Sequence, residues 1–161
     1  MKLKLTNAFK QAAGLGIIAG MRTFAAPIVL SHVYSRHPAK QLKSTSFSLL
    51  QNTPTSKVLK VLGAAELIGD KLPFAPNRTS IGGLTGRFVS GALCGAAVYK
   101  ANRQKPLLGG LIGGVAAIGS AFGCMFLRLS FGKKTKIPDA AIGLMEDVIV
   151  IYTGTVLAKQ L

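Results

Sequence analysis

The stretch PLLGGLIGGVAAIGSAFGCMFL, residues 106–127, runs for 22 residues without a charged side chain. A helix that crosses the hydrocarbon core of a bilayer needs about 20 mostly apolar residues. The stretch therefore predicts a membrane-spanning helix, and it indicates that the chain is an all-α integral membrane protein.

The composition of the whole chain agrees with this prediction. Of 161 residues, 49% are hydrophobic and only 16% are charged, whereas a soluble domain carries about 25% charged residues. The formal net charge is +15, but the basic residues are dispersed among short connections, with no basic helix and no RNA-binding aromatic motif. We expect them to face lipid head groups at helix ends, so the expected partner is the lipid bilayer and not nucleic acid.

Four further apolar segments are each short or interrupted by charges: residues 11–35, 58–72, 88–99 and 140–158. Arg22 lies near the middle of the first segment, and the last contains Glu146 and Asp147. We predict a polytopic helical protein of about five hydrophobic segments, in one integral membrane domain over residues 1–161. Residues 35–56 are rich in Ser, Thr and Lys and are expected to form a polar loop.

The N-terminal region resembles a signal peptide, because a basic beginning precedes a short apolar core. Arg22 directly follows that core, however, and the chain continues apolar to Val33. We interpret the region as a retained first membrane segment, and we expect a multi-pass protein of the cell (inner) membrane.

Glycines spaced four residues apart recur in the apolar segments: Gly16/Gly20, Gly82/Gly86, Gly91/Gly95, Gly109/Gly113, Gly110/Gly114 and Gly119/Gly123. On a helix, such a pair shares one face and allows a neighbouring backbone to approach closely. The spacing predicts tight packing within the bundle or between subunits, and a homodimer is the expected oligomer. If five segments cross, Lys and Arg divide nine against nine between the two sides, so the positive-inside rule gives no orientation.

Only five acidic residues occur in the chain, and four of them belong to apolar segments. The fifth, Asp139, precedes the last segment and is explained as a helix N-cap. Each charge at the bilayer centre costs roughly 2.5–3.5 kcal/mol, so the other four are expected to be paired or to line a water-filled cavity. They are Glu66, Asp70, Glu146 and Asp147.

The spacing of the four carboxylates divides them into two pairs. Glu66 and Asp70 are four residues apart and project from the same helix face, whereas Glu146 and Asp147 diverge by about 100° and should have different partners. The predicted intramembrane site adds the cations Lys71, Arg22 and Arg87, with Arg78 and Arg128 as secondary candidates.

The buried charges have two interpretations. They either form structural ion pairs that hold the helices in register, or they line a polar cavity for an ion, a proton or a small polar solute. An arginine-bearing segment followed by an acid-bearing one occurs twice, which allows an inverted repeat with a broken or re-entrant first segment.

Several of these residues also resemble a known family. The elements are Gly20-Met21-Arg22-Thr23-Phe24, then Glu66-Leu67-Ile68-Gly69-Asp70-Lys71-Leu72-Pro73, then Pro76-Asn77-Arg78, Arg87 and Glu146-Asp147. Together they are similar to the bacterial membrane family catalogued as domain of unknown function 4126, over about residues 14–158. The resemblance implies an integral membrane location and no particular activity.

We therefore expect a small transporter or channel-like protein, with a non-catalytic membrane factor or scaffold as the alternative. An enzyme acting on lipid phosphates has the least support, because no nucleophile–base pair is visible. The sequence predicts no enzyme activity, no cofactor and no metal site.

Overall fold

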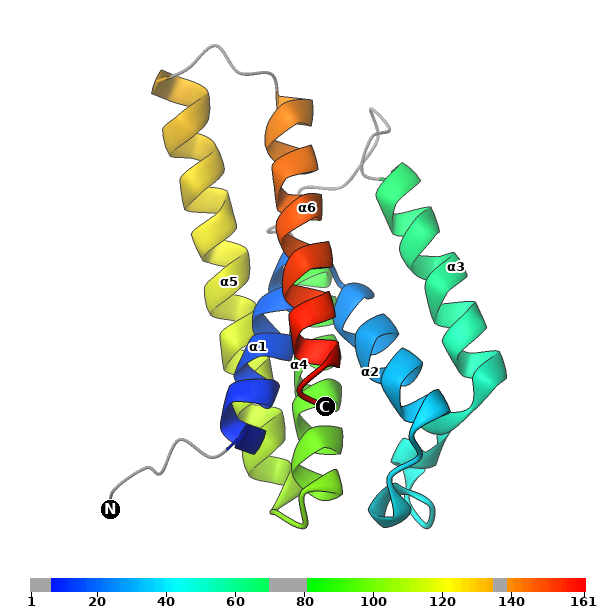
Figure 1. Ribbon diagram of the computed structural model, residues 1–161. Helices are drawn as coiled ribbons and strands as arrows, with labels where there is room; N and C mark the ends of the chain where they lie inside the picture. The colour runs from blue at the N-terminus through cyan, green and yellow to red at the C-terminus, as the bar shows by residue number, and fades with distance from the viewer. Residues whose placement is uncertain (1–6, 70–80, 135–138) are drawn as a thin grey trace, which may run out of the picture.

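The computed structural model describes residues 7–69, 81–134 and 139–161, which are helical apart from short connections (Figure 1). The prediction of an all-α protein is confirmed for these residues. The elements are α1 (Asn7–Met21), α2 (Ala25–Arg36), the 3-10 helices η1 (Lys40–Leu42) and η2 (Ser46–Gln51), α3 (Thr53–Gly69), α4 (Ile81–Ala101), α5 (Pro106–Lys134) and α6 (Asp139–Ala158).

The first hydrophobic segment is two helices that double back on each other. α1 runs alongside α5 in the same direction, and the chain turns at residues 22–24 before α2 returns toward the end where α1 began (Figure 1). With 15 and 12 residues, the two helices are roughly 22 and 18 Å long, shorter than the hydrocarbon core of about 30 Å. Residues 11–35 therefore do not form one continuous crossing helix.

Glycines set the packing of the central helices α1, α4 and α5. A Cβ atom on Gly113 would come closer than 3.0 Å to the backbone of Gly91, and one on Gly16 or Gly20 would come equally close to the α5 backbone. Gly95 and Gly109 approach each other in the same way. These contacts use the glycine faces within the molecule, where they bring the helix backbones together.

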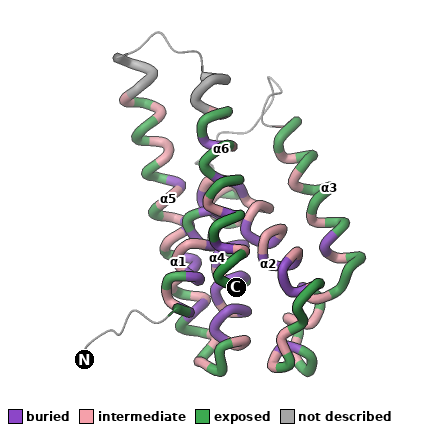
Figure 2. Tube along the Cα trace, in the orientation of Figure 1, coloured by how far each residue is buried: buried purple, intermediate pink, exposed green. Residues whose placement is uncertain are grey.

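α3 stands apart from this core. Ser56 is the buried residue of α3, and most of the other described side chains of the helix are exposed or half-buried (Figure 2). Its neighbours are α2 and η2. α3 is therefore the least embedded long helix in the described part of the chain.

Among the described residues, two helices are long and apolar enough to cross a membrane: residues 81–101 of α4 and residues 106–130 of α5. The five predicted crossings are not confirmed. The first segment doubles back, and α3 carries the charges of Lys57, Lys60 and Glu66 over 17 residues. Large apolar side chains on α5 and α6 nevertheless face outward, such as Phe126 and Val148, and exposed apolar surface of this extent is typical of contact with lipid or another protein.

The region predicted as a polar loop, residues 35–56, contains η1 and η2. Leu42 and Leu50 in these 3-10 helices are buried. Part of the segment therefore covers one end of the bundle, where its leucines pack against apolar side chains of the helices. Asp139, the predicted N-cap, is the first residue of α6, and its side chain lies outside the described part.

The described residues match the arrangement of an inverted repeat only in part. α3 and α6 run in opposite directions, as the repeat predicts, but α1 runs parallel to α5 (Figure 1). In addition, Arg22 lies at a break, whereas Arg128 lies inside the continuous helix α5. The physical cause is the turn at residues 22–24, which has no counterpart in α5.

Candidate site at a helix break

Side chains from other helices form hydrogen bonds with the backbone at the break between α1 and α2. The Glu66 carboxylate of α3 accepts hydrogen bonds from the backbone N–H groups of Thr23 and Phe24, at 2.8 and 3.0 Å. Ser90 of α4 donates its hydroxyl proton to the carbonyl oxygen of Thr23. Phe24 is the N-cap of α2 and its own side chain makes no capping bond, so Glu66 replaces the usual local cap from another helix.

The capping carboxylate has a favourable electrostatic position. The N-terminus of a helix carries a partial positive charge and unpaired N–H groups, so it binds anions. A break in the backbone is tolerated at membrane depth only where protein groups satisfy its polar atoms. Glu66 and Ser90 do this for residues 23 and 24.

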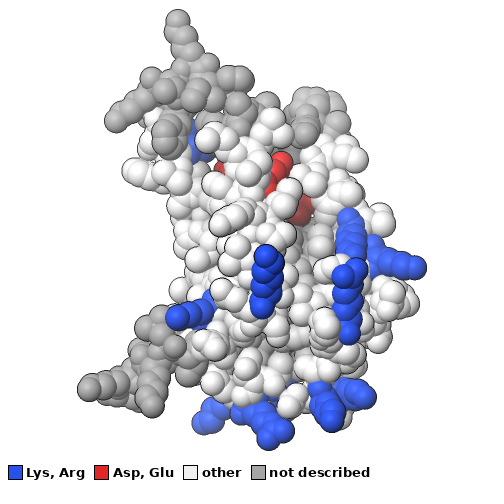
Figure 3. All heavy atoms as spheres, viewed as in Figure 1, with Lys and Arg blue, Asp and Glu red and all other residues white. Residues whose placement is uncertain are grey.

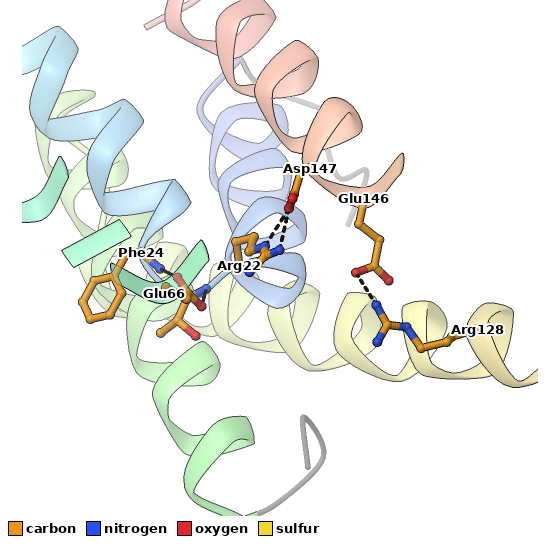
Figure 4. Close-up of polar contacts among 7 residues, drawn as sticks. Arg22, Phe24, Glu66, Arg128, Glu146 and Asp147 are labelled. Carbon is orange, nitrogen blue, oxygen red and sulfur yellow. Dashed lines mark hydrogen bonds and ion pairs between the residues drawn. The ribbon is translucent and has the colours of Figure 1, made fainter. Parts of the chain in front are cut away.

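Arg22, the residue that opens the break, is paired with Asp147 of α6 (Figure 4). Its Nη2 and Nε atoms lie 2.6 and 2.9 Å from the same carboxylate oxygen, Oδ1. The Arg22 and Asp147 side chains are only 7% and 14% exposed, so this is a buried ion pair. It ties α6 to the turn between α1 and α2.

Glu146 points away from this turn, toward α5 (Figure 4). Its Oε2 atom lies 3.3 Å from Nη2 of Arg128, whose side chain is 24% exposed. The prediction that Glu146 and Asp147 have different partners is therefore confirmed. Helical geometry explains it, because consecutive side chains point about 100° apart.

A pocket of about 460 Å³ opens beside the break, between α2, α3 and α6. Arg22, Glu66 and Asp147 line it together with apolar residues such as Ile28 and Val150. His32 and Lys60 also line it, and Lys60 Nζ lies 3.2 Å from His32 Nδ1. Its volume falls in the range of small-molecule sites, about 300–1,000 Å³.

Three of the predicted site residues therefore come together at one pocket. Arg87 is buried in α4, one turn before Ser90, but does not line the pocket. Glu146 and Arg128 form the separate contact between α5 and α6. Asp70, Lys71 and Arg78 lie outside the described residues.

Sequence reasoning missed His32, Lys60 and Ser90 as neighbours of the site, and it allowed a broken first segment without placing the turn. Nothing in the local sequence of His32 indicates a partner on α3. One signal for the turn was present in Pro27. Proline is favoured in the first turn of a helix, and Pro27 is the third residue of α2.

Comparison with known proteins assigns this chain to a family. The family model described as "Domain of unknown function (DUF4126)" matches residues 10–160. The chain belongs to the DUF4126 family. The match includes the α1–α2 hairpin from Lys10 onward and both members of each ion pair. No curated protein and no solved structure matches this DUF4126 chain.

The pocket of this DUF4126 protein is lined by side chains that can carry a proton or a charge. Glu66 and Asp147 are carboxylates held by donors, Arg22 is a fixed cation, and His32 and Lys60 add nitrogen groups at the pocket wall. Within the described residues, no group of three His, Cys, Asp or Glu side chains is placed to hold a metal ion.

Proposed function

We propose that this protein is a small membrane transport protein that takes a proton and a small polar solute into the pocket between α2, α3 and α6. The observation that carries the proposal is the broken first segment, with Glu66 on its backbone and Asp147 on Arg22 beside a pocket. Transporters characteristically form their sites at discontinuous helices whose half-helix ends face the solute. In this proposal α1 and α2 form a re-entrant hairpin in a multi-pass protein.

Glu66 is the proposed proton-carrying group. As an anion it holds the two N–H groups at the start of α2. When it takes up a proton, it loses the charge that the helix N-terminus favours, and this weakens the contact between α3 and the hairpin. Because α3 is little buried elsewhere, it is the helix best able to move and open the pocket.

Arg22 and Asp147 have the proposed role of a switchable ion pair. A solute that carries a carboxylate or phosphate would compete with Asp147 for Arg22, and a cationic solute would compete with Arg22 for Asp147. Either exchange keeps the buried charges paired, which avoids the cost of an isolated charge in the membrane.

The test is transport by the purified protein in liposomes that contain a trapped pH-sensitive dye. Salts of amino acids, small carboxylic acids, phosphate and monovalent cations are added outside, one class at a time. We expect at least one class to drive proton movement that Glu66→Gln abolishes. Glu146→Gln is the matched control, since it removes a neighbouring carboxylate that pairs with Arg128 and does not line the pocket, and it should leave the flux intact.

The second candidate is a non-catalytic membrane scaffold in which the buried charges only hold the helices together. One observation favours it, because each described carboxylate of the site already has a partner within the chain. A complete lack of flux, together with a partner protein that copurifies in a defined subunit ratio, would favour the scaffold over the transporter. The homodimer predicted from the glycine spacing stays a prediction.

A further inference from the structure

The doubling back of α1 and α2 changes how the positive charges are distributed between the two ends of the molecule. It brings the start of α1 to the same end as η1, η2 and the connection between α4 and α5 (Figure 1). Lys10 therefore joins the nine basic residues already expected at that end. We call this end the basic end, and its basic residues in the described part of the chain are Lys10, Arg36, Lys40, Lys43, Lys57, Lys60, Lys100, Arg103, Lys105 and Lys159. The other basic side chains that the structure describes are Arg22, Arg87 and Arg128.

Among the residues that the structure describes, the basic end has no acidic side chain to balance it. Glu66, Glu146 and Asp147 lie near the helix break or beyond it, and Asp139 begins α6 at the opposite end. On the face seen in Figure 3, most of the visible Lys and Arg side chains lie over the lower part of the molecule, while the Asp and Glu side chains lie in the upper part with some basic atoms beside them. This charge has to be balanced by groups outside the protein.

A notch in the basic end has the form of a phosphate site. Gln41, Lys100, Arg103 and Gln104 line a cavity of about 390 Å³ where η1 meets the end of α4. Two cations and two amide side chains supply donors for phosphate oxygens, and Arg in particular matches the geometry of such an anion.

Arg103 has a strained backbone at this notch. Its φ of 59° is in the left-handed region, where glycine is the usual residue just after a helix. The turn is fixed by hydrogen bonds from the N–H of Arg103 to Lys100 O and from the N–H of Gln104 to Tyr99 O, at 3.1 and 2.8 Å. Strained non-glycine residues cluster at functional sites, and here an arginine stands where glycine would be relaxed.

The notch also lies at the depth where lipid head groups would be found. It belongs to the short connection between α4 and α5, the two helices that are long and apolar enough to span. Basic residues next to spanning helices attract anionic lipids, and they lie predominantly on the cytoplasmic side.

We propose that the basic end lies at the cytoplasmic surface of the membrane and that the notch at Lys100 and Arg103 binds the phosphate of an anionic phospholipid. This inference rests on the membrane location proposed above and is independent of transport. In this orientation the α1–α2 hairpin enters the membrane from the cytoplasmic side.

Binding is tested on the full-length protein in a neutral detergent, with short-chain phosphatidylglycerol as the probe. Short-chain phosphatidylcholine and inorganic phosphate are titrated in parallel. We expect phosphatidylglycerol to bind and both other probes to bind much more weakly. Equal affinity for phosphatidylcholine would overturn the charge argument, and inorganic phosphate that binds as tightly as the lipid would overturn the assignment to lipid.

Two double variants distinguish lipid binding at the notch from a general electrostatic attraction of the lipid to the basic end. Lys100→Gln with Arg103→Gln should weaken phosphatidylglycerol binding by roughly thirtyfold, from about 1 kcal/mol for each lost cation near an anionic surface. Lys57→Gln with Lys159→Gln removes the same charge from the basic end outside the notch and should change the affinity by less than about threefold, because salt screens distant charges. Equal losses in the two variants would refute a specific site.

Orientation is tested with single cysteines in a chain whose Cys94 and Cys124 are replaced by alanine. A cysteine at Lys105 reports on the basic end, and one at Ile81 reports on the opposite end. In spheroplasts, a membrane-impermeant maleimide should label Ile81→Cys, and it should label Lys105→Cys only after lysis. The reverse pattern would refute the proposed orientation.

Discussion

Replacement of Asp147 by asparagine should destabilise the protein strongly. The change removes the charge that balances Arg22 but leaves the shape of the side chain almost unaltered. Arg22 is buried and uses two nitrogen atoms on one oxygen of Asp147. Removal of one partner of a buried pair costs about 3–5 kcal/mol, and since asparagine keeps one acceptor oxygen, we expect about 3 kcal/mol.

Glu146→Gln is the matched comparison, at the neighbouring position on the same helix. The Glu146–Arg128 contact is longer, at 3.3 Å, and the Arg128 side chain is partly exposed. The Glu146 side chain is itself only 10% exposed, but water screens the partly exposed Arg128 cation, so we expect a smaller loss of about 1 kcal/mol. The structure therefore predicts a difference of about 2 kcal/mol between two adjacent carboxylates.

The assay is reversible unfolding in mixed micelles, with helicity followed by circular dichroism as denaturing detergent is added. A double-mutant cycle with Arg22→Gln isolates the pair, and the combined variant should be less destabilised than the sum of the two single changes. If Glu146→Gln costs as much as Asp147→Asn, or if the cycle shows no coupling, the buried pair does not hold α6 to the break.

Three further changes test other parts of the structure. Gly113→Ala should lower the unfolding free energy by about 1–3 kcal/mol, because its Cβ would collide with the backbone of Gly91; Gly119→Ala, where nothing lies within 4 Å, should be neutral or slightly stabilising in the same titration. Glu66→Ala should cost about 0.5–2 kcal/mol through loss of the cap on α2, with increased amide hydrogen exchange at residues 23 and 24, and unchanged exchange there would contradict the capping role. Arg103→Gly should stabilise the fold by about 1 kcal/mol, because it relieves the left-handed backbone, and so raise the thermal midpoint while weakening phosphatidylglycerol binding; a lower midpoint would show that the backbone is not strained.

The sequence alone was sufficient for the helical class and for the long apolar helix α5. An uncharged run of 22 residues leaves little alternative to a buried or membrane-embedded helix, and α5 begins at Pro106 as predicted. The scarcity of acids correctly selected Glu66 and Asp147 as residues of one pocket. Helical geometry was enough to predict that Glu146 points elsewhere.

The sequence allowed a broken or re-entrant first segment, and the structure has such a break between α1 and α2. Sequence reasoning could not place the turn at residues 22–24, because apolar length alone cannot distinguish a crossing helix from a hairpin of two short helices. The signals that determine it are largely tertiary. The cap on α2 comes from Glu66, more than 40 residues away in the chain, and Ser90 comes from still further along. The hairpin also changes the basis of the nine-to-nine charge count, which assumed five crossings, since it places Lys10 at the same end as Lys100 and Arg103.

The proposed function requires the pocket between α2, α3 and α6 to be a solute site inside a membrane protein. Water access to that pocket is the most direct test of this proposal. Thr155→Cys lines the pocket, whereas Val148→Cys lies on the exposed apolar surface of the same helix. In liposomes of the purified protein, with Cys94 and Cys124 replaced by alanine, a charged water-soluble thiol reagent should modify Thr155→Cys and leave Val148→Cys unmodified. Protection of both positions would show that the pocket is closed to water and would contradict the proposed site.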